Sequence, residues 1–215
     1  MSLYTHIIWD WNGTLLDDIG ASLKSVNEML DRRGMEPIGF DRYRECIGVP
    51  IRCFYEQVFD LSVENYDNLL AEYNAGYLAA LGECTLSDGA ADALKAFAEM
   101  GITQLIVSSC EMNQLSENVE KYGVSSFFDA VLGADNFLAA SKIDRAEKYL
   151  NENNVTERGR VLVVGDLCHD ADLADKIGAD CVLLTIGHED RKRLENTGHK
   201  IFSDISQLRL YVENK

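Results

Sequence analysis

The chain has 215 residues and a mass of 24.0 kDa; 47% of the residues are hydrophobic, 26% are charged, and only two are prolines. This profile excludes disordered and fibrous proteins, and the length suits one compact core with a modest insertion. Acidic residues outnumber Lys and Arg by 36 to 20, a formal net charge of −16, which argues against nucleic acid and anionic membranes as partners.

Two further features concern location. No apolar stretch approaches the roughly 18 residues that a membrane span requires. The six cysteines form no CxxC pair, as expected for reduced thiols. We therefore predict a cytoplasmic protein without membrane contact. The sequence leaves open whether it is a monomer or a homodimer.

Short apolar runs alternate with helical patterns along most of the chain. The runs at residues 6–9, 103–107, 130–132, 161–164 and 181–184 are predicted as strands, with helices over 88–100, 112–122, 143–153 and 170–177. This alternation predicts an α/β fold, a Rossmann-like parallel sheet with helices on both faces.

A long interval with almost no strand character separates the first two strands. Helices are predicted over residues 19–30, ending near Gly34, over 40–47, after Pro50 and over 61–81. We therefore expect residues 1–16 and 85–215 to form the core, and residues 17–84 to form an inserted helical cap.

Polar side chains follow several of the predicted strands. Asp10 and an Asn12-Gly13 turn follow the first strand, Ser108 ends the second, Lys142 opens a helix, and a GDxxxD acid pair follows the strand at 161–164. Ligands of open parallel sheets bind at the carboxyl ends of the strands. Each feature taken singly has an ordinary explanation: a strand-to-helix turn at Asn12-Gly13, a helix cap for Ser108 and a solvated surface charge for Lys142. Their order and spacing together favour a functional site.

This order of motifs resembles the haloacid dehalogenase superfamily of phosphatases, most closely the branch around phosphoglycolate phosphatase, which has a helical cap. The resemblance implies that Asp10 is the nucleophile and forms an aspartyl-phosphate. It also implies that Mg²⁺ is held by Asp10, the backbone carbonyl of Asn12, Asp166 and Asp170.

The resemblance further assigns roles to the phosphate-binding residues. Ser108 would bind a phosphate oxygen, Lys142 would neutralise the nucleophile and the transferring group, and Ser109 would contact the substrate. The expected function is a Mg²⁺-dependent phosphatase acting on a small phosphorylated metabolite.

Asn12 departs from the pattern, because the phosphatases of this family usually have Asp at this position as general acid and base. An amide cannot exchange the proton, and such catalysis is worth about 10²–10⁴-fold. Three interpretations stay open: a phosphatase that is slow or limited to good leaving groups, a proton supplied by another group such as His169, or a protein that binds a phosphorylated ligand without efficient turnover.

Two other activities fit less well. The dehalogenase branch usually has an aromatic residue at the position of Asn12, and the complete acid pair here suits a metal. A mutase would need the missing acid and base to return a phosphoryl group.

For substrate selection, Arg52 and less strongly Arg44 are candidates to reach a substrate carboxylate or phosphate when the cap closes. Surface pairing of Arg52 with Glu45 or Glu56 is an equal alternative. Asp17 is a candidate to point toward the cap hinge.

Overall fold

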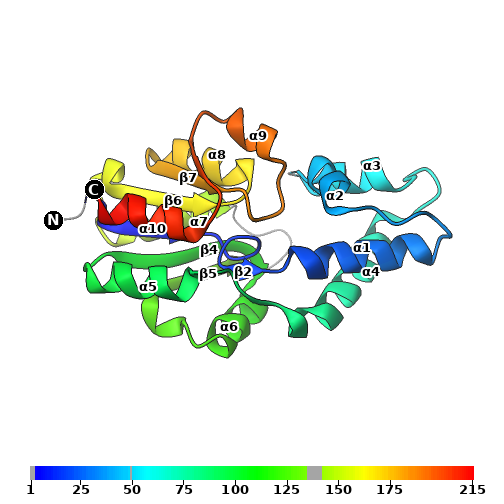
Figure 1. The fold of residues 1–215 in the computed structure, drawn as a ribbon, viewed down its shortest axis with the longest axis horizontal. Coiled ribbons are helices and arrows are strands. Elements are labelled where there is room, and N and C mark those ends of the chain that lie inside the picture. The colour runs from blue at the N-terminus through cyan, green and yellow to red at the C-terminus, as the bar shows by residue number, and fades with distance from the viewer. Residues whose placement is uncertain (1–2, 49, 135–141) are drawn as a thin grey trace.

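The structure is a computed structural model that describes residues 3–48, 50–134 and 142–215 (Figure 1). In the described residues a parallel sheet has the strand order β5-β4-β1-β6-β7-β8. The strands are β1 (His6–Trp9), β4 (Thr103–Glu111), β5 (Ala130–Ala134), β6 (Val161–Gly165), β7 (Asp180–Leu184) and β8 (Lys200–Phe202). The order reverses between β1 and β6, which is the point where Rossmann-type sheets bind ligands.

Successive residues of each strand pack into different cores, as the period of two requires. Ile7 and Trp9 face the core formed with α5 (Ala90–Glu99), α6 (Met112–Lys121) and α10 (Ile205–Glu213). Ile8 faces the core formed with α7 (Lys142–Glu152), α8 (Cys168–Ile177) and α9 (Arg191–Glu195). Helices therefore cover both faces, and the predicted α/β class is confirmed.

The five predicted strands are present, with ends that differ by a few residues. The sequence prediction missed the edge strand β8 and the helices α9 and α10. It also missed a small antiparallel ladder between β2 (Leu16–Asp17) and β3 (Thr85–Leu86). None of these elements changes the position of the central strands.

The chain between β2 and β3 forms a group of helices, which we call the helical lobe (residues 19–83). It contains α1 (Ile19–Asp31), α2 (Phe40–Cys46), α3 (Arg52–Val58), α4 (Tyr66–Ala80) and a 3₁₀ turn, Leu81–Glu83. Figure 1 shows the lobe to the right of the sheet, beyond the ends of β1 and β4. The lobe has its own apolar core, which includes Met29, Phe54 and Leu69.

The fourth helix of the lobe begins later than predicted. It starts at Tyr66 rather than residue 61, because the Asn65 side chain accepts a hydrogen bond from the backbone N–H of Asn68 and caps the helix there.

Among the described residues, no helix has both the length and the apolar character that a bilayer crossing requires.

Candidate active site

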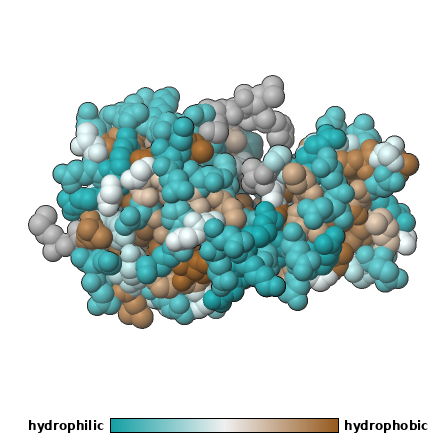
Figure 2. Space-filling model, turned by 90° about the horizontal axis from the view of Figure 1, so that it is seen from above, coloured by the Kyte–Doolittle hydropathy of each residue, from teal (hydrophilic) through white to brown (hydrophobic). Residues whose placement is uncertain are grey.

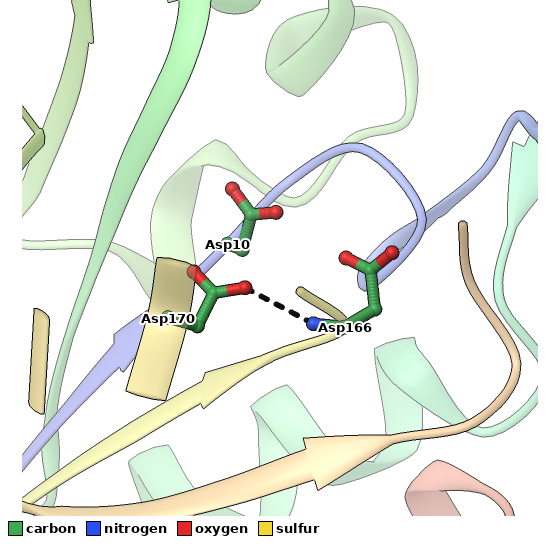
Figure 3. Close-up of side chains that lie close together, drawn as sticks. All are labelled: Asp10, Asp166 and Asp170. Atoms are coloured by element: carbon green, nitrogen blue, oxygen red, sulfur yellow. Dashed lines mark hydrogen bonds between the residues drawn. The ribbon is translucent and has the colours of Figure 1, made fainter. Parts of the chain in front are cut away.

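Three carboxylates meet at the point where the strand order reverses (Figure 3). Asp10 follows β1, Asp166 follows β6, and Asp170 lies in the first turn of α8. All three are buried, and each offers an oxygen within 4.8 Å of the others. The structure thus brings together the three acids that the sequence placed at strand ends.

Neighbouring donors fix the orientation of two of these carboxylates. The Thr14 hydroxyl donates to Oδ1 of Asp166 at 2.9 Å, and the backbone N–H of His188 donates to its Oδ2 at 2.7 Å. The backbone N–H groups of Asp166 and Leu167 donate to Oδ2 of Asp170 at 3.1 and 3.0 Å. Most of these donors come from loops at the ends of β1, β6 and β7, so the sheet itself positions the acids.

Lys142, the first residue of α7, reaches into this cluster. Its Nζ lies 2.8 Å from Oδ1 of Asp10 and 2.5 Å from Oδ1 of Asp170, and the side chain is buried. Burial alone would lower the pKa of Lys142, but the two carboxylates raise it above its ordinary value. Lys142 is therefore cationic and compensates part of the negative charge.

The charge of the cluster is suited to a further cation. Burial, opposed by Lys142, raises the pKa of Asp10 to about 6. Burial also raises the pKa of Asp166 to about 8, although the His188 charge opposes the shift. Buried acids retain protons in this way when too little positive charge faces them, and an oxygen-rich donor set fits a hard divalent ion such as Mg²⁺.

The turn after β1 can approach the cluster because it contains a glycine. Gly13 has φ +71°, and a Cβ there would lie 2.4 Å from both Oδ2 of Asp166 and Cδ2 of His188. A side chain would therefore displace a cluster carboxylate. The predicted Asn-Gly turn is present, and close approach is the physical reason for its glycine.

The Asn12 side chain points toward the helical lobe. Its Nδ2 donates to Oδ2 of Asp18 and to the Tyr77 hydroxyl, both at 2.8 Å, and the Tyr77 hydroxyl donates to the same Asp18 oxygen at 2.7 Å. Asp18 lies just before α1 and Tyr77 lies in α4. The Asn12 amide thus joins the turn after β1 to the lobe.

A buried histidine extends this network. His188 Nε2 lies 3.1 Å from Oδ1 of Asp18, and its Nδ1 lies 3.0 Å from the Tyr43 hydroxyl of α2. Burial would lower the pKa of His188, but the Asp18 charge raises it to about 9. Burial would likewise raise the pKa of Asp18, but His188 and the donors Tyr77 and Asn12 hold it below its ordinary value.

Sequence reasoning missed Asp18, His188, Tyr43 and Tyr77. His188 had a usable signal, because it follows the predicted strand at residues 181–184 as Asp10 follows the first strand. Asp17, the candidate for the hinge, pairs with Thr85 in the β2–β3 ladder and is exposed; its neighbour Asp18 turns inward instead.

The two predicted serines lie at the same cavity as the carboxylates. The Ser108 side chain is buried, and its Oγ accepts a hydrogen bond from the backbone N–H of Cys110 at 3.1 Å. An Arg145 NH2 group donates to the Ser108 carbonyl at 2.7 Å and holds this end of β4. Ser109 is exposed and lines the cavity beside Ser108.

Arg52 does not reach this cavity in the described structure. Its Nε pairs with Oε1 of Glu56 at 2.9 Å, and its guanidinium lies 5.1 Å from the centre of the Tyr66 ring. This is the surface pairing that the sequence left as an alternative, so substrate binding by Arg52 stays a prediction without support from the geometry.

The other candidates lie closer. Arg44 donates to the carbonyl of Gly187 at 3.0 Å and of Ile186 at 3.3 Å, so it joins α2 to the loop after β7. His169 lines the cavity. Its part in proton transfer stays a prediction.

The cavity itself lies between the sheet and the helical lobe and has a volume of about 580 Å³. Asp10, Ser108 and Lys142 line it from the sheet side, and Tyr43 and Tyr73 line it from the lobe side. The arrangement places a buried carboxylate, a lysine and a hydroxyl around a space of the size that small ligands occupy.

Comparisons with known proteins agree with this geometry. The profile of the haloacid dehalogenase-like hydrolase family matches residues 7–184. A phosphoglycolate phosphatase from Rhodobacter capsulatus is 28% identical over 96% of both chains, and a 5′-nucleotidase from Pseudomonas aeruginosa is 24% identical over 98% of this chain and 96% of its own. A haloacid dehalogenase-like hydrolase from Streptococcus pneumoniae superposes with a TM-score of 0.81 at 18% identity, covering 98% of this chain and 99% of its own.

Proposed function

The chain belongs to the haloacid dehalogenase-like hydrolase family, and on that premise we propose that this enzyme is a phosphatase that transfers the phosphoryl group of a small phosphate monoester to Asp10. The observation that carries the proposal is the buried cluster of Asp10, Asp166 and Asp170 with Lys142, at the reversal point of the sheet. The names of the two curated relatives also point to phosphate monoesters.

Each residue of the cluster has a part in the proposed reaction. A carboxylate oxygen of Asp10 bonds to phosphorus as the bond from phosphorus to the ester oxygen breaks, and the departing alkoxide takes a proton from water to become the alcohol. Water then hydrolyses the aspartyl-phosphate, which releases phosphate and restores the Asp10 carboxylate. Lys142, which contacts Asp10 at 2.8 Å, orients the nucleophile and faces the charge that spreads over the phosphoryl oxygens. The Ser108 hydroxyl, at the cavity wall, donates to one of those oxygens.

Asp10, Asp166 and the backbone carbonyl of Asn12 would hold Mg²⁺, which supplies positive charge to the phosphoryl oxygens when bound. Asp170 has its two oxygens engaged by Lys142 and by backbone N–H groups. Asp170 thus positions Lys142 and is a further candidate ligand, as is Asp166, whose two oxygens accept hydrogen bonds from Thr14 and the backbone N–H of His188.

The helical lobe acts as the cap in this proposal. It forms the wall of the cavity opposite Asp10, and Tyr43, Asn12 and Arg44 make hydrogen bonds between lobe and sheet domain. Closing such a wall excludes water from the phosphoryl group. The boundaries at residues 17 and 84 lie at the small β2–β3 ladder.

A second candidate function follows from Asn12. Its amide is committed to Asp18 and Tyr77 and cannot deliver a proton to the leaving alcohol. A protein of this kind binds phosphorylated ligands and turns over only those with good leaving groups. Acetyl phosphate, whose leaving group needs little protonation, separates the two functions.

The test is phosphate release from a panel of monoesters and acetyl phosphate, with Mg²⁺ or with a chelator, on protein whose Asn12 is intact by mass. We expect metal-dependent release of phosphate, and we expect Asp10→Asn to abolish it. The matched control Asp17→Asn, which changes an exposed residue of β2, should retain the activity. Circular dichroism and thermal melts confirm folding of both variants. Release that survives in Asp10→Asn contradicts the proposal, and release from acetyl phosphate alone selects the second candidate.

A further inference from the structure

A second cavity adjoins the active-site cavity inside the helical lobe. Its volume is about 730 Å³, and it lies among α2, α3 and α4. The two cavities have Tyr43, Ile47, Ile51, Tyr73 and Asn74 as common lining residues, so they are direct neighbours. We call the cavity inside the lobe the aromatic pocket.

The walls of the aromatic pocket are largely apolar, and five of its eleven described lining residues are aromatic. Tyr43, Phe54, Tyr55, Tyr66 and Tyr73 line it, and the rings of Phe54 and Tyr55 stand edge to face with centroids 5.5 Å apart. Figure 2 shows hydrophobic side chains at the surface of the right-hand part of the molecule, where Figure 1 places the lobe. Such walls favour flat or apolar groups over hydrated ones.

The charges around this space disfavour a second acidic group on the ligand. No Lys or Arg is among the described residues that line the aromatic pocket, and Asp67 stands at its wall. The cations of the adjoining cavity, Lys142 and His188, are held by Asp10, Asp170 and Asp18. A carboxylate brought here would lose hydration without gaining a partner.

The nearest arginines are also engaged. Arg52 lies over the ring of Tyr66, 5.1 Å from its centre, and pairs with Glu56, while Arg44 donates to backbone carbonyls of the loop after β7. Arg193, near Gly48, contacts Glu189 at 2.6 Å and the Ile47 carbonyl. Each would have to give up a charge partner or hydrogen bonds to meet an acidic ligand.

From this geometry we propose that the substrate is a phosphate monoester whose alcohol part is uncharged and carries an aromatic or extended apolar group. The phosphate lies at Asp10, and the apolar group occupies the aromatic pocket. This inference rests on the proposed phosphatase function and names the class of alcohol that the enzyme releases.

Binding tests the inference without requiring turnover. Calorimetry with the full chain and Mg²⁺ compares 4-phenylbutylphosphonate, ethylphosphonate and 3-phosphonopropionate, none of which has an ester to hydrolyse. We expect 4-phenylbutylphosphonate to bind at least about tenfold more tightly than ethylphosphonate, because binding transfers its phenyl ring from water into the apolar pocket. We expect 3-phosphonopropionate to bind no more tightly than ethylphosphonate.

Three variants, one of them a control, locate the binding. Ala71 is exposed on α4 and lines the aromatic pocket, so Ala71→Phe fills it and removes the advantage of the phenylbutyl compound while affinity for ethylphosphonate is kept. Ala79→Phe, also exposed on α4 but outside both cavities, is the matched control. Ile51→Lys, at the junction of the cavities and 43% exposed, should shift preference toward 3-phosphonopropionate.

The outcomes separate this inference from the proposed function. Equal binding of all three compounds, or tightest binding of the carboxylate by the unaltered chain, overturns the substrate class even where phosphate esters are hydrolysed. Tight binding of the phenylbutyl compound, lost in Ala71→Phe, supports the pocket even where no ester is hydrolysed, and in that case only the catalytic proposal fails.

Discussion

The two walls of the active-site cavity differ in chemistry. The wall from the sheet is charged and tightly constrained: Asp10 and Lys142 line it, and they belong to one buried cluster with Asp166 and Asp170 that ion pairs and hydrogen bonds hold in place. The wall from the helical lobe is aromatic, and its described lining residues include neither Lys nor Arg. The comparison teaches that the sheet domain supplies fixed charged groups, which suit the phosphate and metal of the proposed reaction, whereas the lobe supplies apolar surface, which suits the proposed apolar group.

Polar contacts join the two walls beside the cavity. Asn12 reaches Asp18 and Tyr77, and His188 reaches Asp18 and Tyr43. Changes on the sheet side should therefore alter catalysis most, and changes at the joining contacts should alter how the lobe sits over the site.

The largest expected effect is the removal of the buried lysine. Lys142→Met takes the only described cation in contact with Asp10 and Asp170 out of the cluster. We expect kcat/KM for acetyl phosphate to fall by about 10³-fold. We also expect the metal-free protein to lose about 3 kcal/mol of unfolding free energy at neutral pH, because two carboxylates lose their partner.

The matched control is Lys148→Met, which removes an exposed lysine of the same helix. Urea denaturation and steady-state phosphate release measure both variants. Equal activity of Lys142→Met and Lys148→Met would show that the charged wall does not act on the phosphoryl group.

The next effect concerns the missing acid. Asn12→Asp places a carboxyl group 2.8 Å from the Asp18 carboxylate, which raises the pKa of the new acid. The new side chain then carries a proton near neutral pH and can deliver it to the leaving alcohol. We expect about a 10²-fold gain in kcat for alkyl phosphates and little gain for acetyl phosphate.

A steady-state comparison of the two substrate types measures this gain. Asn113→Asp, an amide at an exposed position of α6, is the control. A rise of the same size for acetyl phosphate would mean that protonation of the leaving group is not the missing step.

The pH dependence of metal binding is the third test of the charged wall. The raised pKa values, about 6 for Asp10 and about 8 for Asp166, mean that the metal-free folded protein binds protons more tightly than the unfolded chain. This contribution to stability is present in acid and is lost as the pH rises through about 8. Mg²⁺ must displace these protons, so we expect its affinity to rise by up to about tenfold per pH unit between pH 6 and 8.

Calorimetry at pH 6, 7 and 8, with proton release followed in two buffers, measures the effect. Thermal melts should show a larger Mg²⁺-induced stabilisation at pH 8 than at pH 6. Affinity that is independent of pH would show that the acids are already ionised without metal.

The smallest effect is expected where the walls meet. Tyr43→Phe removes the hydroxyl that lies 3.0 Å from His188 Nδ1 and leaves that buried nitrogen without its partner. We expect a loss of about 1 kcal/mol in unfolding free energy. A looser lobe should also raise KM a few-fold and leave kcat little changed.

Tyr66→Phe is the matched control, since no hydrogen bond of the Tyr66 hydroxyl is found among the described residues and its ring stays in the aromatic pocket. Denaturation curves and initial rates compare the two. A larger effect for Tyr66→Phe would place the important hydroxyl inside the pocket rather than between the walls.

Prediction from sequence was most successful for the central strands. Residues 6–9 and 161–164 are apolar on both faces, so they had to lie in the middle of a covered parallel sheet, and the acids that follow them had to emerge at one edge. The edge strand Lys200–Phe202 was missed because three partly exposed residues carry little periodic signal.

Sequence reasoning predicted those site residues that lie near the end of a strand or the start of a helix. Asp10, Ser108, Lys142, Asp166 and Asp170 meet as expected, and most of them follow a strand or open a helix. Arg52 was proposed because it is poorly placed for its helix dipole, but a local partner four residues away, Glu56, compensates it.

The sequence by itself determined the α/β class, the helical insertion and the acids at the strand ends, because these depend on local periodicity and on the single direction of parallel strands. The tertiary structure alone decided that Asp18 meets His188, 170 residues away, and that aromatic side chains of three helices enclose a pocket. Such contacts depend on how helices pack against the sheet and one another, and no local pattern specifies that packing.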